Sequence, residues 1–181
     1  MSKYFSSLLS ICLLFPAPAI LASDGQGEAA PVVFTTSPQP VRFKLANEEW
    51  EEAVATLTLV EAHADDSLSG LLIVSNTEGQ RRSLAQKIGV DWPSLPSTLA
   101  RREVRARWVK GTACPELRLA IEALEASYGG QTLRFPPFVL RIQETSETLP
   151  QLLCGWTRQI NARRPRRGFV MAINRLLMKD N

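Results

Sequence analysis

The sequence predicts an α+β fold, a single domain in which an antiparallel sheet of about five or six strands carries two amphipathic helices packed on one face. Three observations support this prediction. Several stretches alternate apolar and polar residues, a period that is typical of half-buried strands. Two other stretches repeat apolar residues at helical spacing. The chain that follows an N-terminal leader has the length of one ordinary domain.

The leader, MSKYFSSLLSICLLFPAPAILAS, has the layout of a secretory signal peptide. Lys3 gives it a short basic start, an apolar segment follows, and small residues end it. We expect cleavage after Ala22, with Ala19 as the alternative, so that residues 1–22 are removed. The apolar segment is shorter than the roughly 20 residues that cross a bilayer, and we therefore expect no permanent membrane span.

The remaining chain divides into a flexible N-terminal lead, residues 23–40, and a single α+β domain, residues 41–181. A short β-like piece in the lead, residues 32–35, is interpreted as a tether or an edge strand. Arginine outnumbers lysine 16 to 5 and the chain has no Asn-x-Ser/Thr site, which favours a bacterial periplasmic protein. A lipoprotein signal at Cys12 is disfavoured, because Ile11 stands where a small residue is needed.

Two cysteines, Cys114 and Cys154, remain after removal of the leader, in a chain expected to enter an oxidising compartment. A disulfide between them is the expected state. It closes a loop of about 40 residues, for which chain-entropy theory gives roughly 4 kcal/mol. The alternative, a nucleophilic cysteine, needs a histidine to generate the thiolate, and the single histidine, His63, lies in a polar run.

The first half of the domain predicts mainly strands. Asn47 precedes an acidic stretch that favours a helix start, and residues 54–61 alternate as a strand. GLLIVSN, residues 70–76, and RRSLAQKI, residues 81–88, flank a turn and predict a hairpin. The segment VDWPSLPSTL is a predicted loop, because each of its prolines lacks a backbone donor.

The second half mixes strands and helices. Residues 102–111 alternate apolar and charged side chains and predict a strand. Residues 114–130 and 148–164 carry helical stripes, so Cys114 is expected at a helix entrance and Cys154 beside the second stripe. TLRFPPFVLRIQE predicts a strand pair or a bulged strand around its two prolines. Residues 168–178 fit both a strand and a helix, and the strand is preferred.

Charge is divided unevenly along the chain. Residues 24–78 hold 10 acidic and 2 basic residues, whereas residues 79–181 hold 8 acidic and 18 basic ones. The two halves either cover each other in the folded domain or leave a dipole suited to docking on an acidic surface.

The densest basic segment is ARRPRRG, which contains Arg163, Arg164, Arg166 and Arg167. Arginines near the end of a helix complement its dipole, which gives part of the cluster a structural role. As candidate binding residues, they grip carboxylate or phosphate groups bidentately. The export signal argues against nucleic acid, which leaves an acidic protein, an anionic lipid or an envelope polymer as partner.

Common enzyme motifs are missing from the sequence, including G-x-S-x-G, H-E-x-x-H, a phosphate-binding glycine loop and C-x-x-C. His63, Asp65 and Asp66 are interpreted as a polar loop. The candidate carboxylates for glycoside hydrolysis are Glu49, Glu52 and the same two aspartates. Carboxylates at this density are more often solvated surface residues. We expect no cofactor and no metal.

Four tryptophans occur in the chain: Trp50, Trp92, Trp108 and Trp156. They are expected to anchor the core or its edge, with the exception of Trp92. Because Trp92 lies in the proline-rich loop, it is the one expected to be exposed and is a further candidate binding residue.

Together these features predict a non-catalytic periplasmic protein that binds another envelope protein with an acidic surface. Its expected role is that of an accessory or assembly factor of a secretion, pilus or conjugation apparatus. One alternative is a structural subunit that donates residues 31–40 as a strand to a neighbour. The other alternative is a cysteine- or carboxylate-dependent envelope hydrolase.

Overall fold

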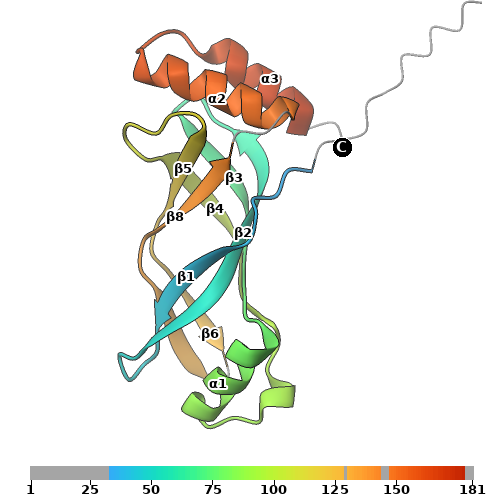
Figure 1. Ribbon diagram of the computed structural model, residues 1–181, viewed down its shortest axis with the longest axis vertical. Helices are drawn as coiled ribbons and strands as arrows, with labels where there is room; N and C mark the ends of the chain where they lie inside the picture. Colours follow the sequence, from blue (N-terminus) through green and yellow to red (C-terminus); the bar gives the residue numbers. More distant parts are fainter. Residues whose placement is uncertain (1–32, 129, 144–146, 178–181) are drawn as a thin grey trace, which may run out of the picture.

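The computed structural model describes residues 33–128, 130–143 and 147–177, which form one antiparallel curled sheet of eight strands and three α-helices. The α+β class is confirmed, but the expected number of strands was too low. Helices α2 and α3 lie together over one end of the sheet, and α1 lies at the other end (Figure 1). Two helices on one face of the sheet are therefore a wrong expectation. The predicted signal peptide, residues 1–22, lies outside the described residues.

The strands vary from short hairpin segments to one long central strand. They are β1 Gln39–Lys44, β2 Trp50–Ala62, β3 Ser67–Ser75, β4 Thr98–Trp108, β5 Glu116–Ile121, β6 Leu124–Tyr128, β7 Gln131–Phe135 and β8 Phe138–Gln143. The helices are α1 Glu78–Ile88, α2 Thr148–Asn161 and α3 Arg167–Leu177, with a 3₁₀ turn, η1, at Trp92–Ser94. None of the helices in the described residues is long and apolar enough to cross a membrane.

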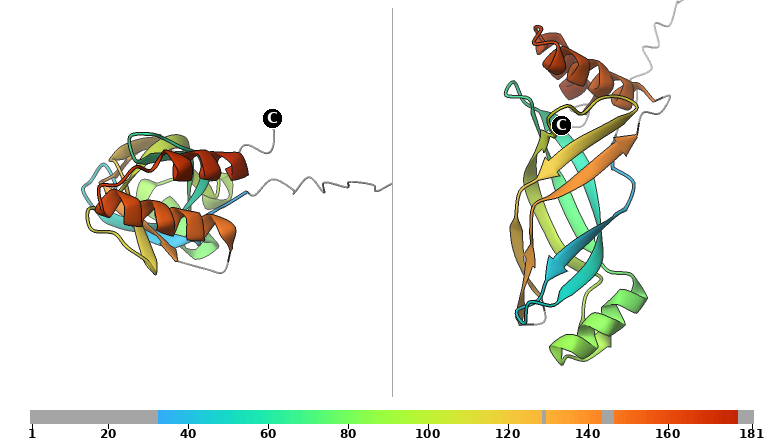
Figure 2. Two further views of the ribbon diagram at one scale, coloured as in Figure 1. Left: turned by 90° about the horizontal axis from the view of Figure 1, so that it is seen from above. Right: turned by 60° about the vertical axis from the view of Figure 1, so that its left-hand side comes forward.

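The strand order across the sheet is β6-β7-β1-β2-β3-β4-β5-β8. β5 and β6 follow each other in one chain segment, β7 and β8 in the next, and the two segments form one long hairpin. The β5–β8 half of this hairpin joins the sheet at β4, whereas the β6–β7 half joins it at β1. The hairpin therefore links the two ends of the sheet, which curls round a central core (Figure 2).

Two prolines bend this hairpin. Pro136 and Pro137 separate β7 from β8, and Glu122 and Ala123 separate β5 from β6 on the other side. Proline has no backbone N–H, so the ladder stops at this point. The prediction of a strand pair or a bulged strand is therefore correct in placing two strands around the prolines, but β7 pairs with β6 and β8 pairs with β5, not with each other.

The side chain of Gln39 closes the sheet between β1 and β8. Its amide nitrogen Nε2 donates to the carbonyl oxygen of Arg141 at 2.7 Å, and its Oε1 accepts from the backbone N–H of Arg141 at 2.7 Å. The amide thus takes the place of a backbone peptide in the ladder, and it satisfies both groups of Arg141 at the strand edge.

The described part of the N-terminal lead lies along β2. The backbone N–H of Thr36 donates to the carbonyl of Leu57, and the N–H of Leu59 donates to the carbonyl of Phe34, each at 2.9 Å. Thr36 is buried, and Thr35 bridges to β2. The lead thus extends the β1 edge of the sheet, in agreement with an edge strand.

The core is formed by alternate residues of the strands. In β2 and β3 the inward residues are mostly leucine and alanine, and Leu57, Leu68 and Leu72 are at most 1% exposed. Gly70 lies on the same face, where an added Cβ would stand 2.3 Å from the backbone oxygen of Thr58. Only glycine therefore allows β3 to approach β2 at this point.

The predicted helix at residues 114–130 is wrong, because this segment forms β5 and β6. Leu117, Leu119 and Ile121 alternate and are all buried, so period two describes the core-facing residues. The helical stripe used the same Leu117 and Ile121, and short apolar runs fit both templates. Pairing of all six β5 residues with β8 decides in favour of the strand.

The predicted strand at residues 81–88 is also wrong, because these residues belong to α1. Thr77 and Gln80 form a capping box: the Gln80 N–H donates to the Thr77 hydroxyl at 3.3 Å, and the Thr77 N–H donates to the Gln80 side chain at 2.9 Å. Gly89, with φ of 70°, ends the helix in the left-handed conformation.

Two further segments differ from expectation. Asn47 begins no helix, because Glu48 turns the chain with φ of 66° and β2 starts at Trp50. Residues 168–177 form α3 rather than the preferred strand, so the helical alternative is the correct one. Ile173 of α3 is fully buried, which gives the helical stripe its partner surface.

Helix α2 is held on the sheet by a disulfide and an aromatic pair. The expected Cys114–Cys154 disulfide is present, with the two Cα atoms 5.7 Å apart. Cys114 lies in the loop between β4 and β5 rather than at a helix entrance. Trp108 of β4 and the buried Trp156 of α2 meet edge to face, with ring centroids 5.7 Å apart.

Replacing both cysteines with serine is expected to lower the free energy of unfolding by about 2–4 kcal/mol, because the bridge restrains the unfolded chain over a separation of 40 residues. Urea unfolding followed by tryptophan fluorescence measures the change. Dithiothreitol should shift the wild-type midpoint by a similar amount and leave the double variant unchanged. A wild-type midpoint insensitive to the reductant would contradict the prediction.

Gly70→Ala is expected to destabilise the protein by about 1–3 kcal/mol, because the new Cβ overlaps the backbone of β2. Gly79→Ala is the matched control, since nothing lies within 4 Å of a Cβ at that position in α1. Alanine favours the helix, so the control should be neutral or slightly more stable. Equal stability of the two variants in urea unfolding would show that β2 and β3 are not in close contact.

Candidate functional site

The basic segment predicted as a binding site forms the turn between α2 and α3. We call residues 162–167 the arginine turn. Helix α2 ends at Asn161, and the backbone N–H groups of Ala162, Arg163 and Arg164 bond to its last carbonyl oxygens. Arg163 adopts φ of 53°, a left-handed conformation that reverses the chain. Backbone bonds to the end of α2 thus shape the start of the turn.

Arg166 anchors the arginine turn to the sheet. Asp66 lies in the turn between β2 and β3, and the guanidinium group of Arg166 binds its carboxylate through both Nε and Nη2. The two side chains are 34% and 21% exposed, so the pair is partly shielded from water. A two-bond arginine–carboxylate contact is more directional than a single bond. Arg166 therefore has a structural partner, which separates it from the rest of the cluster.

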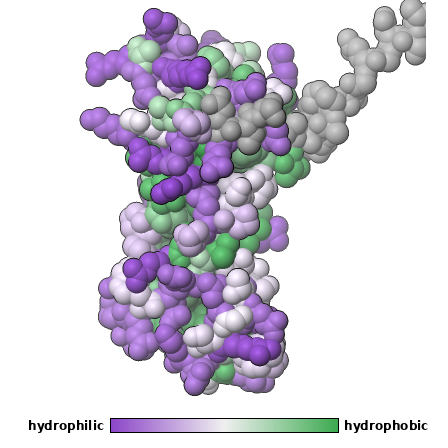
Figure 3. Space-filling view, in the orientation of Figure 1, coloured by the Kyte–Doolittle hydropathy of each residue, from purple (hydrophilic) through white to green (hydrophobic). Residues whose placement is uncertain are grey.

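The other three arginines of the turn, Arg163, Arg164 and Arg167, are exposed. No described residue forms an ion pair or a side-chain hydrogen bond with them. In the space-filling view, hydrophilic residues protrude from the α2–α3 end of the molecule (Figure 3). The α2 C-terminus carries a partial negative charge that favours cations nearby. This end presents three guanidinium groups whose donors face solvent.

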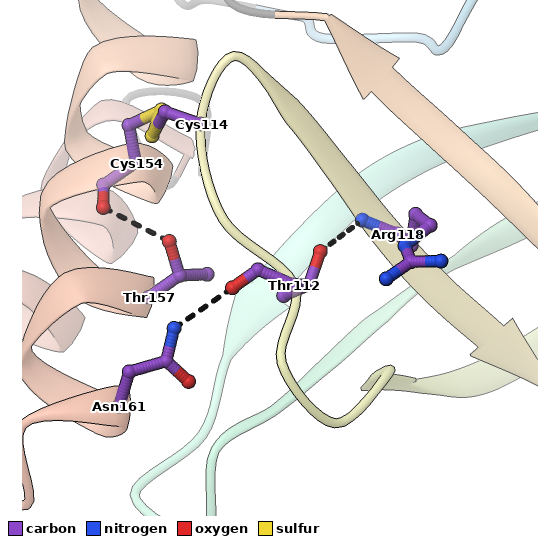
Figure 4. Close-up of a disulfide and its surroundings, with 6 residues drawn as sticks. All are labelled: Thr112, Cys114, Arg118, Cys154, Thr157 and Asn161. Carbon is purple, nitrogen blue, oxygen red and sulfur yellow. Dashed lines mark hydrogen bonds between the residues drawn. A yellow bond between two sulfur atoms is a disulfide. The ribbon is translucent and has the colours of Figure 1, made fainter.

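The disulfide and the hydrogen bonds around it hold the end of α2, where the arginine turn begins. Asn161 donates to the carbonyl oxygen of Thr112 at 2.8 Å, and the hydroxyl of Thr112 accepts from the backbone N–H of Arg118 at 2.7 Å. These contacts and the bridge from Cys114 to Cys154 join the last turns of α2 to the β4–β5 loop (Figure 4). The start of the arginine turn is therefore fixed relative to the sheet.

The polar residues considered around His63 do not converge on one point. His63 lies 3.1 Å from the hydroxyl of Ser69, while Asp66 faces Arg166. Asp65 accepts from the hydroxyl of Ser67 at 2.6 Å and from Arg105 at 3.1 Å. The hydrogen bond from Ser67, and then the charge of Arg105, hold the pKa of Asp65 below its usual value.

The carboxylates considered for hydrolysis are divided between the two ends of β2. Glu49 precedes the strand and lies 3.8 Å from Lys87 of α1, whereas Asp65 and Asp66 follow the strand. Lys87 also binds Glu51, and that hydrogen bond raises the pKa of Lys87. Among the described residues, no group of three His, Cys, Asp or Glu side chains is placed to hold a metal ion.

Trp92 is half-buried in η1, which packs against α1. Helix α1 lies at the opposite end of the molecule from α2 and α3 (Figure 1). The guanidinium carbons of Arg81 and Arg82 lie 4.9 and 4.5 Å from its ring centroid. The structure thus does not bring Trp92 together with the four arginines. The most exposed of the four tryptophans is Trp50, at 42%, and not Trp92.

No pattern in the sequence identifies Asp66 as the partner of Arg166. The two residues are 100 positions apart, and only the fold brings the β2–β3 turn beside the start of α3. An acidic residue in a polar run is common at surfaces, so no local pattern distinguishes it.

No protein-family model matches this sequence, and no similar curated protein or solved structure was found.

A double-mutant cycle with Asp66→Asn and Arg166→Gln is expected to give a coupling of about 1 kcal/mol in the free energy of unfolding, because the pair is bidentate and partly shielded. The matched control is the Asp65–Arg105 pair, in which both side chains are about half exposed. Its coupling should stay below about 0.5 kcal/mol. A larger coupling for the control pair would contradict the anchoring role of Arg166.

Proposed function

We propose that this protein is a non-catalytic periplasmic binding protein that docks on an acidic surface of another envelope protein. The docking element is the arginine turn, and the role is that of an accessory or assembly factor of a secretion, pilus or conjugation apparatus. The observation that carries the proposal is that the arginines of the turn have different roles. Arg166 is anchored to Asp66, while Arg163, Arg164 and Arg167 stay exposed and unpaired among the described residues.

The geometry supports carboxylates as the groups that are bound. A guanidinium group presents a planar fork of donors that matches a carboxylate. Because the turn is fixed by backbone bonds, the disulfide and the Asp66 contact, less conformational entropy is lost when it binds. Clustered charge of one sign also steers an acidic partner to the site and makes association sensitive to salt.

Two observations favour the envelope. The disulfide fits an extracellular or periplasmic compartment, where such bridges form and persist. The predicted leader, residues 1–22, agrees with export, and the periplasm is the proposed destination.

A binding role is also supported by the state of the residues considered for catalysis. Both cysteines are joined in the disulfide, so neither is a thiolate nucleophile in this structure. Glu49, Asp65 and Asp66 each have a cationic neighbour that belongs to the framework of the fold. Glu52, the remaining carboxylate considered, is exposed in β2 and forms no ion pair with a described residue.

The alternative of strand donation would require the lead to leave its own sheet. Thr35 and Thr36 pair with β2 within the chain, and Thr36 is buried there. Donation to a neighbour is therefore possible only by exchange of this segment between subunits. No observation favours such an exchange over the intramolecular pairing.

The docking proposal is tested with the triple variant Arg163→Gln, Arg164→Gln and Arg167→Gln. Immobilised wild-type protein is expected to retain an acidic envelope protein from periplasmic extract and to release it at about 0.5 M salt, where exposed charges are screened. The triple variant should bind the protein identified in this way about tenfold more weakly or worse, as measured by calorimetry.

The matched control replaces Arg101, Arg107 and Arg118 with Gln. These arginines are exposed on the outer face of β4 and β5, and their side chains have no ion pair among the described residues, so the same charge is removed from the sheet instead of the turn. The control should bind as the wild type does. Equal losses in the two triple variants, or binding that is insensitive to salt, would refute docking through the arginine turn.

A further inference from the structure

The curled sheet is open along a seam between β4 and β6. β4 pairs with β3 from Thr98 to Arg107, but it pairs with β5 only at Arg107 and Trp108. β6 lies next to β4 in space but forms its ladder with β7 alone. One edge of β4 therefore faces one edge of β6 without a strand ladder between them.

The bend in the hairpin explains this seam. At the break marked by Pro136 and Pro137 the β6–β7 half turns away from β4 toward β1. Beyond the opening, the hydroxyl of Tyr128 donates to the carbonyl oxygen of Pro96, which ties β6 to the loop before β4. Burial raises the pKa of Tyr128, so the hydroxyl keeps its proton at neutral pH. The seam is thus joined at both ends and open between them.

A cleft of about 670 Å³ lies at this opening. Its apolar wall includes Leu124, Phe135 and Pro136, and Trp50 contributes an exposed ring. Its basic residues are Lys44, Arg102 and Arg134. Pockets of roughly 300–1,000 Å³ that combine apolar walls with a few polar groups are the usual size for small ligands.

Arg102 is the unusual residue of the cleft. In the register of β3 and β4 it lies opposite Leu72, which is 1% exposed, so it belongs to the core-facing side of the sheet. Ala100 and Ala106 on the same face of β4 are buried. Arg102 itself is exposed, because the seam opens the core face to solvent at this point. A charged residue at a core-facing position indicates a functional requirement.

The guanidinium group of Arg102 has no hydrogen bond or ion pair with any described residue. The other two cations of the cleft are already neutralised. Lys44 lies 2.6 Å from Glu48, and Arg134 lies 3.3 Å from Glu48 and 3.5 Å from Glu125. The hydrogen bond from Lys44 holds the pKa of Glu48 below its usual value, which keeps this carboxylate charged. Arg102 is therefore the cation left for a ligand.

We propose that the cleft binds a small amphiphilic carboxylate. The carboxylate pairs with Arg102, and the aliphatic or aromatic body of the ligand lies against Leu124, Phe135 and Pro136. The cleft offers a single free guanidinium group and is also lined by the carboxylate of Glu125, which favours a monoanion over a more highly charged phosphate. This site is separate from the arginine turn and does not depend on the docking proposal.

Decanoate, below its micelle-forming concentration, is the probe for this site, with 1-decanol and butyrate as comparison ligands. Isothermal titration calorimetry should show decanoate binding at least tenfold more tightly than 1-decanol, because only the carboxylate gains a charge-assisted hydrogen bond. Butyrate should bind more weakly still, because it buries less apolar surface. Decanoate should also change the fluorescence of the wild type more than that of Trp50→Phe.

Arg102→Met keeps an unbranched apolar side chain and removes the charge. This variant should bind decanoate at least tenfold more weakly and 1-decanol as the wild type does. Arg101→Met is the matched control, since its side chain lies on the outer face of the same strand, and its affinity for decanoate should stay within about twofold of the wild type. Arg102→Lys retains the charge and should have an intermediate affinity.

Thermal unfolding of each variant shows whether the fold is kept, and Arg102→Lys replaces Arg102→Met if the latter does not fold. Failure of decanoate to bind the wild type would overturn the proposal. So would equal affinity for decanoate and 1-decanol, or equal losses in Arg101→Met and Arg102→Met. The triple variant of the arginine turn should bind decanoate normally, so failure of the docking proposal leaves this result unaffected.

Discussion

Pro136 and Pro137 break the long hairpin of β5, β6, β7 and β8, so that one half pairs with β4 and the other half with β1. This bend is the constraint on which the architecture depends. A straight hairpin would add two strands to one end of an open sheet. The bent hairpin instead joins both ends, encloses the leucine-rich core and leaves the seam beside β4.

The helical end of the molecule depends on a different set of contacts. Trp156 packs α2 on the end of β4, and Cys154 ties α2 to the β4–β5 loop. The side chain of Asn174 fixes α3 on β2 by accepting from the N–H of Ala62 and donating to its carbonyl. Gly155 allows the ring of Phe169 to lie close, since an added Cβ would be 2.4 Å from it. The arginine turn thus joins two helices that are each tied to the sheet, which limits the positions its side chains can reach.

Much of the sheet could be predicted from the sequence, because β2 and β4 alternate over many residues and the prolines mark the break before β8. The helix α2 was found because its stripe is long. β5 was missed because Leu117 and Ile121 fit both periods, and only pairing with β8 distinguishes them. The start of α1 is marked in the sequence by the capping-box residues Thr77 and Gln80. A binding role of Arg102 could not be predicted from the sequence, because it depends on the register with Leu72 and on the open seam beside β4.

The acidic half of the chain, residues 24–78, and the basic half, residues 79–181, largely neutralise each other through ion pairs. Glu48, Glu49, Glu51, Asp65 and Asp66 from the acidic half all pair with cations from the basic half. Most of these pairs are exposed and each adds little stability, so their main effect is to neutralise charge locally. The arginine turn and Arg102 are places where this neutralisation stops. At the turn the surplus charge faces outward on a fixed apex, which suits a large acidic surface. At Arg102 it faces a cleft with an apolar wall, which suits a small anion that has an apolar body.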